Sequence, residues 1–139
     1  MSAAYVKTAQ TALVVDANSA EREQITRCLQ SFYRVLMANN LGEATIYVRQ
    51  VHPAVVVLDP DLPDGDGIEW LRGLRADPAT RTLVVACVTH RSSIREKVTG
   101  FLAGADDYVI YPIDPETFAY RVALLARIGR RSIQFPGSK

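Results

Sequence analysis

The sequence is poor in cysteine and has no long hydrophobic run. Its two cysteines, Cys28 and Cys87, lie far apart in apolar, periodic segments. We therefore predict two small, free, buried thiols in a reduced protein, and neither a disulfide nor a metal site. No apolar run approaches the roughly 20 residues that a membrane-spanning helix needs, and residues 1–10 lack the charged-then-apolar pattern of a secretory signal. We expect no membrane association and a cytoplasmic location.

The chain also lacks an excess of either charge. It has 16 lysines and arginines against 15 aspartates and glutamates, so nothing favours a polyanion such as DNA as the partner of this segment. With 139 residues, 48% of them hydrophobic and 22% charged, the chain suits one globular domain. We place that domain at 11–131, after an N-terminal extension over 1–10 and before a linker or tail over 132–139.

Short apolar runs alternate with amphipathic stretches along the whole chain. The apolar runs predict five strands, over 12–16, 33–37, 55–58, 83–88 and 107–110. Continuous β-branched runs, such as the one at 55–57, fit parallel strands that are covered on both faces. Five strand–helix repeats predict an α/β fold, a doubly wound five-stranded parallel sheet with the flavodoxin-like order 2-1-3-4-5.

Polar residues mark the starts of the intervening helices. Three starts have the spacing of a capping box, in which glutamate follows a polar N-cap residue after three positions: Asn18 with Glu21, Asn40 with Glu43, and Ser93 with Glu96. The last helix begins with an N-cap aspartate and a proline, Asp114-Pro115. Apolar residues at helical spacing predict an inward-facing stripe on the first helix: Ile25, Cys28, Leu29 and Phe32.

Four of the predicted strands are followed by polar residues at the point where each strand ends. Asp16 and Asp59 follow the first and third strands, Thr89 the fourth, and Tyr111 the fifth. In an open parallel sheet, ligands bind beyond the carboxyl ends where the strand order reverses, here between the first and third strands. Two neighbouring carboxylates repel each other unless a cation or proton intervenes. We therefore expect a site for a hard divalent ion such as Mg²⁺.

Several motifs, in order along the chain, resemble receiver domains of two-component response regulators. They are the strand end at 14–16, the segment from Val57-Leu58-Asp59 through Leu62-Pro63 to Gly67, the single Thr89, and Gly104-Ala105-Asp106-Asp107-Tyr108. The similarity covers residues 11–131 and needs no large insertion. The 104–108 run and the basic helix end at 130–131 are most similar to the winged-helix transcription-factor subclass.

The resemblance implies roles for five residues. Asp59 would accept a phosphoryl group from a phosphohistidine of a sensor histidine kinase, with Mg²⁺ bridging the acceptor and the phosphoryl group. Asp16 would lie on the metal side, and Asp61 would offer its backbone carbonyl to the metal. Thr89 would bind a phosphoryl oxygen, and Tyr108 would change rotamer as the adjoining surface switches. Beyond phosphorylation and dephosphorylation of Asp59, such a domain is not an enzyme.

Two positions depart from the usual receiver pattern. The second acid after the first strand, generally a metal ligand, is Ala17, and the lysine that precedes the proline after the fifth strand is Tyr111. A tyrosine donates a hydrogen bond but cannot neutralise a phosphoryl dianion. Because phosphoryl transfer depends on positioning and electrostatics, we expect slow phosphorylation, weak Mg²⁺ binding, or neither. Three nearby polar residues are candidates to compensate for Ala17: Asn18, Asp61 and Asp64.

His90 stands at the pocket entrance, where receivers commonly have a small residue. Three arrangements are open for it: it narrows the entrance, donates a charge-assisted hydrogen bond to Asp59, or faces solvent. Two functions are also open for the whole domain. It is either a working phosphoswitch or a phosphorylation-independent pseudo-receiver, which acts through protein contacts, dimerisation or another ligand.

The resemblance also implies a dimerisation surface. In winged-helix regulators, the fourth helix, fifth strand and fifth helix form a two-fold dimer through charged pairs. Asp107 and Arg121 match one such pair, and Lys97 matches the basic member of another, whose acidic position is Thr117 here. We expect a homodimer through this surface and a DNA-binding domain after residue 139 in the natural protein.

Other ligand sites fit the sequence less well. Asp59-Pro60-Asp61 resembles the start of a haloacid-dehalogenase-like phosphatase motif, but Pro63 stands where that motif has a small hydroxyl residue, and the run lies mid-chain. A calcium loop fails because Pro63 occupies its fifth position and Trp70 stands in place of the closing glutamate. A flavin or dinucleotide site would need a glycine-rich loop, and 16–19 contains no glycine.

Overall fold

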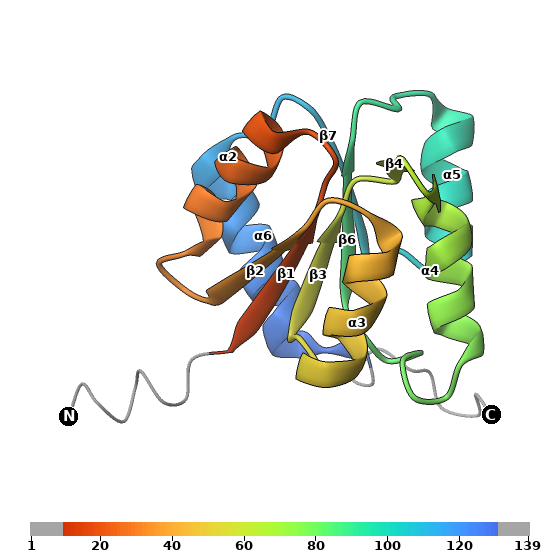
Figure 1. The fold of residues 1–139 in the computed structure, drawn as a ribbon. Helices are drawn as coiled ribbons and strands as arrows, with labels where there is room; N and C mark the ends of the chain where they lie inside the picture. Colours follow the sequence, from red (N-terminus) through yellow and green to blue (C-terminus); the bar gives the residue numbers. More distant parts are fainter. Residues whose placement is uncertain (1–9, 131–139) are drawn as a thin grey trace.

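The computed structural model describes residues 10–130 and has a parallel sheet at its centre (Figure 1). The five strands are β1 (Thr11–Val15), β2 (Arg34–Ala38), β3 (Val55–Leu58), β6 (Val85–Thr89) and β7 (Asp107–Ile110). Their order in the sheet is β2-β1-β3-β6-β7, and every neighbouring pair is parallel. The predicted order 2-1-3-4-5 is therefore confirmed. The predicted tail over 132–139 lies outside the described residues, as do Arg131 and all of the predicted N-terminal extension except Gln10.

Helices cover both faces of the sheet (Figure 1). They are α2 (Ser19–Leu29), α3 (Leu41–Val51), α4 (Gly67–Ala76), α5 (Ile94–Ala103) and α6 (Pro115–Ile128). Residues of α3, α4 and α5 join one hydrophobic core, and residues of α2 and α6 join the other.

Within 10–130, no helix is both long enough and apolar enough to cross a membrane. Cys28 and Cys87 are free, as predicted, although only Cys87 is fully buried.

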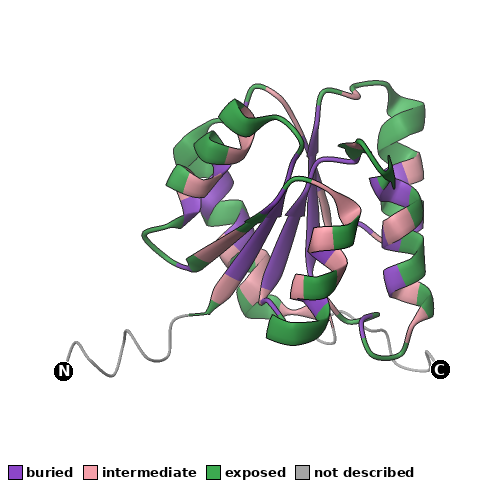
Figure 2. Cartoon of the chain, in the orientation of Figure 1, coloured by how far each residue is buried: buried purple, intermediate pink, exposed green. Residues whose placement is uncertain are grey.

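Alternation along each strand supplies both cores. Leu13 and Val15 of β1 belong to the core under α3, α4 and α5, whereas Val14 belongs to the core under α2 and α6. Successive strand residues point to opposite faces, so a strand covered on both sides needs continuous apolar residues. The burial colours in Figure 2 show this as a purple sheet between greener helices. The two helical layers thereby fix the strands and the residues that follow them.

The predicted N-caps are present, but the return bond of a capping box, from the N-cap N–H to the glutamate, is not formed at Asn18, Asn40 or Ser93; Glu43 accepts the Asn39 N–H and Glu96 accepts the Ser93 hydroxyl. The N-cap side chains each accept a hydrogen bond from the third residue after them, at Asn18, Asn40, Ser93 and Asp114. At the start of α2, the Asn18 N–H donates to Asp16 Oδ1 at 2.8 Å, which is the bond that a capping-box Glu21 would make. The carboxylate of Glu21 is therefore available for other contacts.

Several details differ from the predictions. β1 and β2 are each shifted by one residue from the predicted strands over 12–16 and 33–37. β6 begins at Val85 and not at residue 83. The predicted loop over 59–67 contains a short antiparallel hairpin, made of β4 (Asp61–Leu62) and β5 (Gly65–Asp66). Phe32 is 59% exposed, because α2 ends at Leu29 and Phe32 lies in the turn that follows, outside the helical stripe.

A buried ion pair closes the amino edge of the sheet. Arg75, in the last turn of α4, donates to the carbonyl oxygen of Gly104 and to Asp106 Oδ2, the latter at 3.2 Å. Asp106 also accepts the Val85 N–H at 2.9 Å and contacts Arg130 at 2.5 Å. One acid of the 104–108 motif therefore stabilises the edge of the sheet opposite to Asp59.

The Tyr108 ring lies inside the molecule, where it packs on a glycine of α5. Tyr108 is 4% exposed, and a Cβ added at Gly100 would lie 2.8 Å from two of its ring carbons. Carbon atoms in contact are normally 3.5–4.0 Å apart. Glycine at position 100 therefore makes room for the inward ring.

We expect Gly100→Ala to lower the free energy of unfolding by about 1–3 kcal/mol, because the added methyl group and the Tyr108 ring compete for one space. Gly73→Ala, on α4, is the matched control, since a Cβ there would meet nothing within 4 Å and alanine favours a helix. Urea denaturation of both variants measures the difference. Equal stability of the two variants would contradict the packing of Tyr108 on Gly100.

Candidate functional site

Four polar residues converge at the carboxyl edge of the sheet, as the strand ends predict. Asp16 and Asp59 follow the adjacent strands β1 and β3, and the Asp59 N–H donates to the Val15 carbonyl at 2.8 Å. Thr89 ends β6, and its carbonyl accepts the N–H of Tyr111, which follows β7, at 3.0 Å. Asp16, Asp59 and Thr89 are all buried, with exposed fractions of 1%, 6% and 0%. The hydrogen bonds between the parallel strands therefore continue into these residues and position the site.

A third carboxylate, from Glu21 in the first turn of α2, joins Asp16 and Asp59. One oxygen from each of the three residues lies within 4.8 Å of the other two. Sequence reasoning missed Glu21, because its spacing from Asn18 suggested a capping role. Its position could have revealed it, because Glu21 lies in the first turn of the helix that follows β1. Within residues 10–130, these three acids lie close enough together to hold a metal ion.

Burial and mutual repulsion change the acidity of the cluster. Burial, with the charges of Asp16, Asp61 and Glu21, raises the pKa of Asp59 to about 6, against the opposing effect of the Asp61 N–H that donates to Asp59 Oδ1 at 3.0 Å. Burial also raises the pKa of Asp16. Both acids hold their protons more tightly than exposed aspartates do.

Tyr111 and His90 form a stacked pair at the rim. The Tyr111 hydroxyl donates to Asp16 Oδ2 at 3.1 Å, and burial together with the Asp16 charge raises the pKa of Tyr111, so the hydroxyl stays protonated. The two rings stack with their centroids 4.5 Å apart. His90 Nε2 lies 2.5 Å from Glu21 Oε2, a contact that raises the pKa of His90. Of the three arrangements left open for His90, the hydrogen bond to Asp59 is not formed; the ring contacts Glu21 and its side chain is 64% exposed.

Arg91 contacts four residues at or near the site. Its N–H donates to Thr89 Oγ1 at 3.1 Å, and its carbonyl accepts the Tyr108 hydroxyl at 2.9 Å. Its guanidinium donates to Asp61 Oδ1 at 2.5 and 3.1 Å and lies 3.7 Å from Asp66. The backbone of Arg91 therefore links the end of β6 to the inward Tyr108 ring.

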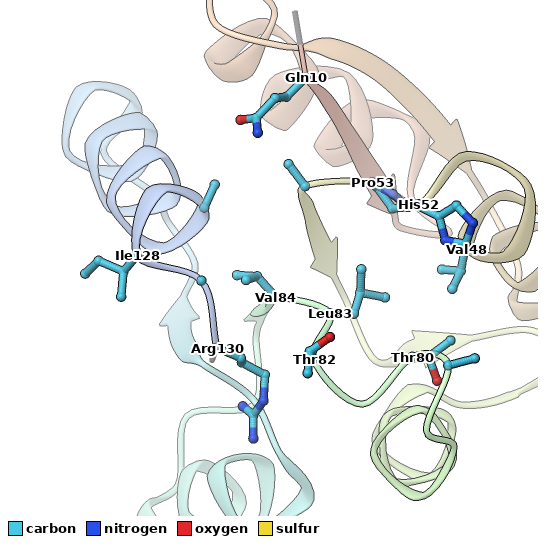
Figure 3. Close-up of a pocket in the computed structure, with 14 residues that line it drawn as sticks. Gln10, Val48, His52, Pro53, Thr80, Thr82, Leu83, Val84, Ile128 and Arg130 are labelled. Atoms are coloured by element: carbon cyan, nitrogen blue, oxygen red, sulfur yellow. The ribbon is translucent and has the colours of Figure 1, made fainter. Parts of the chain in front are cut away.

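A hollow of about 350 Å³ lies at the opposite, amino edge of the sheet (Figure 3). It is bordered by the ends of α3 and α6 and by the residues that precede β3 and β6, among them His52, Val84 and Arg130. None of its lining residues is acidic. The hollow is therefore separate from the acidic site.

Residues 12–123 match the response regulator receiver domain family. The chain belongs to this family. It is 29% identical over 128 residues to PhoB, the phosphate regulon transcriptional regulatory protein of Escherichia coli K12. The aligned region covers 91% of this chain and 56% of PhoB. It is 38% identical over 116 residues to the response regulator MprA of Mycobacterium leprae. This aligned region covers 83% of this chain and 50% of MprA. The chain thus spans about half the length of these two regulators.

Solved receiver structures share the fold. The beryllofluoride-activated receiver domain of DrrB, from Thermotoga maritima, is 32% identical to this chain and superposes with a TM-score of 0.74. The match covers 84% of this chain and 97% of the DrrB domain. The chain is accordingly a receiver domain of the kind found in two-component response regulators, with the doubly wound fold of that family.

The three residues considered as replacements for the acid missing at position 17 make other contacts. Asn18 caps α2 through its bond with the Glu21 N–H at 2.9 Å, and Asp61 pairs with Arg91. Asp64 accepts the N–H groups at the start of α3, from Leu41 at 2.8 Å and Gly42 at 3.0 Å. None of these three side chains belongs to the carboxylate cluster, in which Glu21 is the acid that lies beside Asp16 and Asp59.

The proposed signalling surface comprises α5, β7 and α6. Asp107 and Arg121 pair within the chain, at 2.7 and 2.8 Å. Lys97 and Thr117 line a groove between the two helices, together with Tyr108 and Arg121. Large apolar side chains of α5 are exposed beside it: Ile94, Val98, Phe101 and Leu102.

We expect Asp59→Asn to raise the free energy of unfolding in metal-free buffer at pH 7.5, by about 1–3 kcal/mol. The pKa of folded Asp59, about 6, lies above that of an unfolded aspartate, so ionisation of Asp59 destabilises the fold as the pH rises through this window. The advantage of asparagine should disappear near pH 4, where the folded carboxyl is protonated. Urea denaturation at both pH values measures it, with exposed Glu23→Gln as the control. A variant that is no more stable than wild type at pH 7.5 contradicts the raised pKa.

Proposed function

We propose that this receiver is a working phosphoswitch that accepts a phosphoryl group on Asp59. The observation that carries the proposal is the meeting of Asp59 with the carboxylates of Asp16 and Glu21, beside the buried Thr89 at the end of the next strand. The family match does not favour the pseudo-receiver alternative. In a working phosphoswitch, Ala17 and Tyr111 would change the rate of phosphorylation and the affinity for Mg²⁺.

In the proposed reaction, a carboxylate oxygen of Asp59 attacks the phosphorus of a phosphohistidine on a sensor histidine kinase. An O–P bond forms as the N–P bond breaks, and the leaving imidazole keeps the electron pair and takes up a proton. With a pKa of about 6, Asp59 is mostly ionised at neutral pH and is available as the nucleophile. Thr89 Oγ accepts the Arg91 N–H, which leaves its own proton to donate to a phosphoryl oxygen. We propose no enzymatic activity beyond this transfer and the loss of the phosphoryl group.

The donor set at the rim fits a divalent cation. Three carboxylate oxygens close together are ligands that Mg²⁺ prefers, so we propose that Asp16, Glu21 and Asp59 hold it, with the carbonyl of Asp61 as a further ligand. Glu21 then supplies the acid that Ala17 lacks. Bound Mg²⁺ would neutralise part of the negative charge on the carboxylates and the phosphoryl group. Since Glu21 contacts His90, metal binding by Glu21 competes with that contact.

Incubation with acetyl phosphate and Mg²⁺ tests the proposed acceptor. We expect the intact mass of the wild type to increase by one phosphoryl group, and that of Asp59→Asn to stay unchanged. Both proteins are checked for folding by circular dichroism. A folded wild type without an adduct, under conditions that modify an ordinary receiver, contradicts the phosphoswitch and favours the pseudo-receiver.

Calorimetric titration with Mg²⁺ tests the role of Glu21. We expect Glu21→Gln to weaken Mg²⁺ binding roughly tenfold or more, because it removes a charged ligand, while Glu23→Gln on the same helix leaves it unchanged. Adding Ala17→Asp to Glu21→Gln should restore affinity, and His90→Ala should strengthen binding by releasing Glu21. Wild-type affinity in Glu21→Gln would exclude Glu21 as a ligand.

The relatives suggest which other parts the whole protein contains. We propose that 11–131 is the receiver, that 1–10 is an extension and 132–139 a linker, and that a DNA-binding output domain follows, as the transcriptional role in PhoB's name suggests. A sensor histidine kinase would be the phosphodonor, and the cytoplasm the location.

We further propose a homodimer through α5, β7 and α6. Its support is the exposed apolar side chains of α5 beside Lys97 and the Asp107–Arg121 ion pair. These charges are partly solvated, so their own contribution is modest, about 0–1 kcal/mol each. Light scattering of the beryllofluoride-bound protein over a range of concentrations tests the proposal, and a monomer at every concentration contradicts it.

A further inference from the structure

The phosphorylation proposed for Asp59 would place a dianion next to an acidic cluster, and the usual cation is missing. Tyr111 occupies the lysine position, and its hydroxyl donates to Asp16, not to Asp59. A neutral hydroxyl cannot balance a phosphoryl charge. Apart from the proposed Mg²⁺, the site therefore lacks the fixed positive charge that the lysine would supply beside Asp59.

The backbone of Arg91 is held at the rim from two sides. Its N–H donates to Thr89 Oγ1, and its carbonyl accepts the Tyr108 hydroxyl. Thr89 is the residue proposed to bind a phosphoryl oxygen, and it is fully buried. The starting point of the Arg91 side chain is thereby fixed next to the proposed phosphoryl position.

The side chain of Arg91 extends over the loop that carries Asp59. Its guanidinium contacts Asp61 Oδ1, and the N–H of the same Asp61 donates to Asp59 Oδ1. The side chain is 27% exposed, so it is partly shielded from water. A guanidinium remains charged at every relevant pH and binds phosphoryl oxygens with two parallel N–H groups.

We infer that Arg91 is the phosphoryl-binding cation of this receiver, in place of the lysine absent at Tyr111. Asp61 holds the guanidinium ready, and a phosphoryl group on Asp59 draws it inward. The bond between Tyr108 and the Arg91 carbonyl then connects phosphoryl binding to the α5–β7–α6 surface. The inference rests on the proposed phosphorylation of Asp59.

Arg22 is a second arginine at this edge of the sheet. Its Nη1 donates to the main-chain carbonyl of Asp16 at 2.8 Å, on the side of β1. Arg91 has the closer connection to the acceptor, because it bonds Thr89 directly and contacts Asp61, two residues after Asp59. The experiment therefore includes both arginines.

The test measures binding of beryllofluoride, an analogue of the phosphoryl group, to the whole chain at saturating Mg²⁺ by calorimetry. We expect Arg91→Gln to weaken binding about 10- to 100-fold, the loss that corresponds to a charge-assisted hydrogen bond. Arg91→Lys should lose less, and Tyr111→Lys added to Arg91→Gln should recover most of the affinity. Arg95→Gln, an exposed arginine of α5, is the matched control and should bind as wild type does.

Binding of Mg²⁺ alone provides the second readout. Arg91→Gln should bind Mg²⁺ at least as tightly as wild type, because it removes a cation and no ligand. Wild-type beryllofluoride affinity in Arg91→Gln, an equal loss in Arg95→Gln, or a larger loss in Arg22→Gln overturns the role of Arg91 and leaves the phosphoswitch intact. Failure of the wild type itself to bind beryllofluoride overturns both proposals.

Discussion

Three carboxylates meet where β1, β3 and α2 come together, and their mutual repulsion is the constraint on which the rest of the site depends. Asp16, Glu21 and Asp59 bring oxygens within 4.8 Å of one another at strand ends that two helical layers shield from water. Neighbouring groups reduce this repulsion through direct contacts, with Tyr111 on Asp16 and His90 on Glu21. A proton, a metal ion or an arginine relieves it further, so ligand binding and folding stability are coupled at this edge.

The two departures from the receiver pattern have different structural counterparts. Ala17 leaves a position without an acid, and Glu21 brings a carboxylate to the same cluster from one helical turn further on. Tyr111 stands where the pattern has a cation. Arg91 brings a fixed positive charge to the loop that carries Asp59, through its contact with Asp61. In both cases a charge of the sign that the pattern requires lies on a neighbouring element. Phosphoryl transfer depends on where charges lie and not on which segment carries them.

The two edges of the sheet have different tasks. At the amino edge, Arg75 and Asp106 satisfy main-chain groups of the chain entering β6 and β7, which fixes these strands. At the carboxyl edge, the same strands end in Thr89 and lead to Tyr111, where charge is concentrated. Tyr108 lies between the edges, and its inward ring depends on the space left by Gly100.

The sequence by itself determined the strands, their order and the convergence of Asp16, Asp59 and Thr89, because continuous apolar runs must be covered on both faces and parallel strands end at one edge. It could not assign Glu21, His90 or Arg91. Glu21 has the spacing of a capping residue, and only the folded chain shows that Asp16 takes the Asn18 N–H in its place. The contacts of His90 and Arg91 likewise depend on where α2 and the β4–β5 hairpin lie. Spacing along the chain determines local structure, whereas the direction of a long polar side chain is decided by partners that only the tertiary fold brings near.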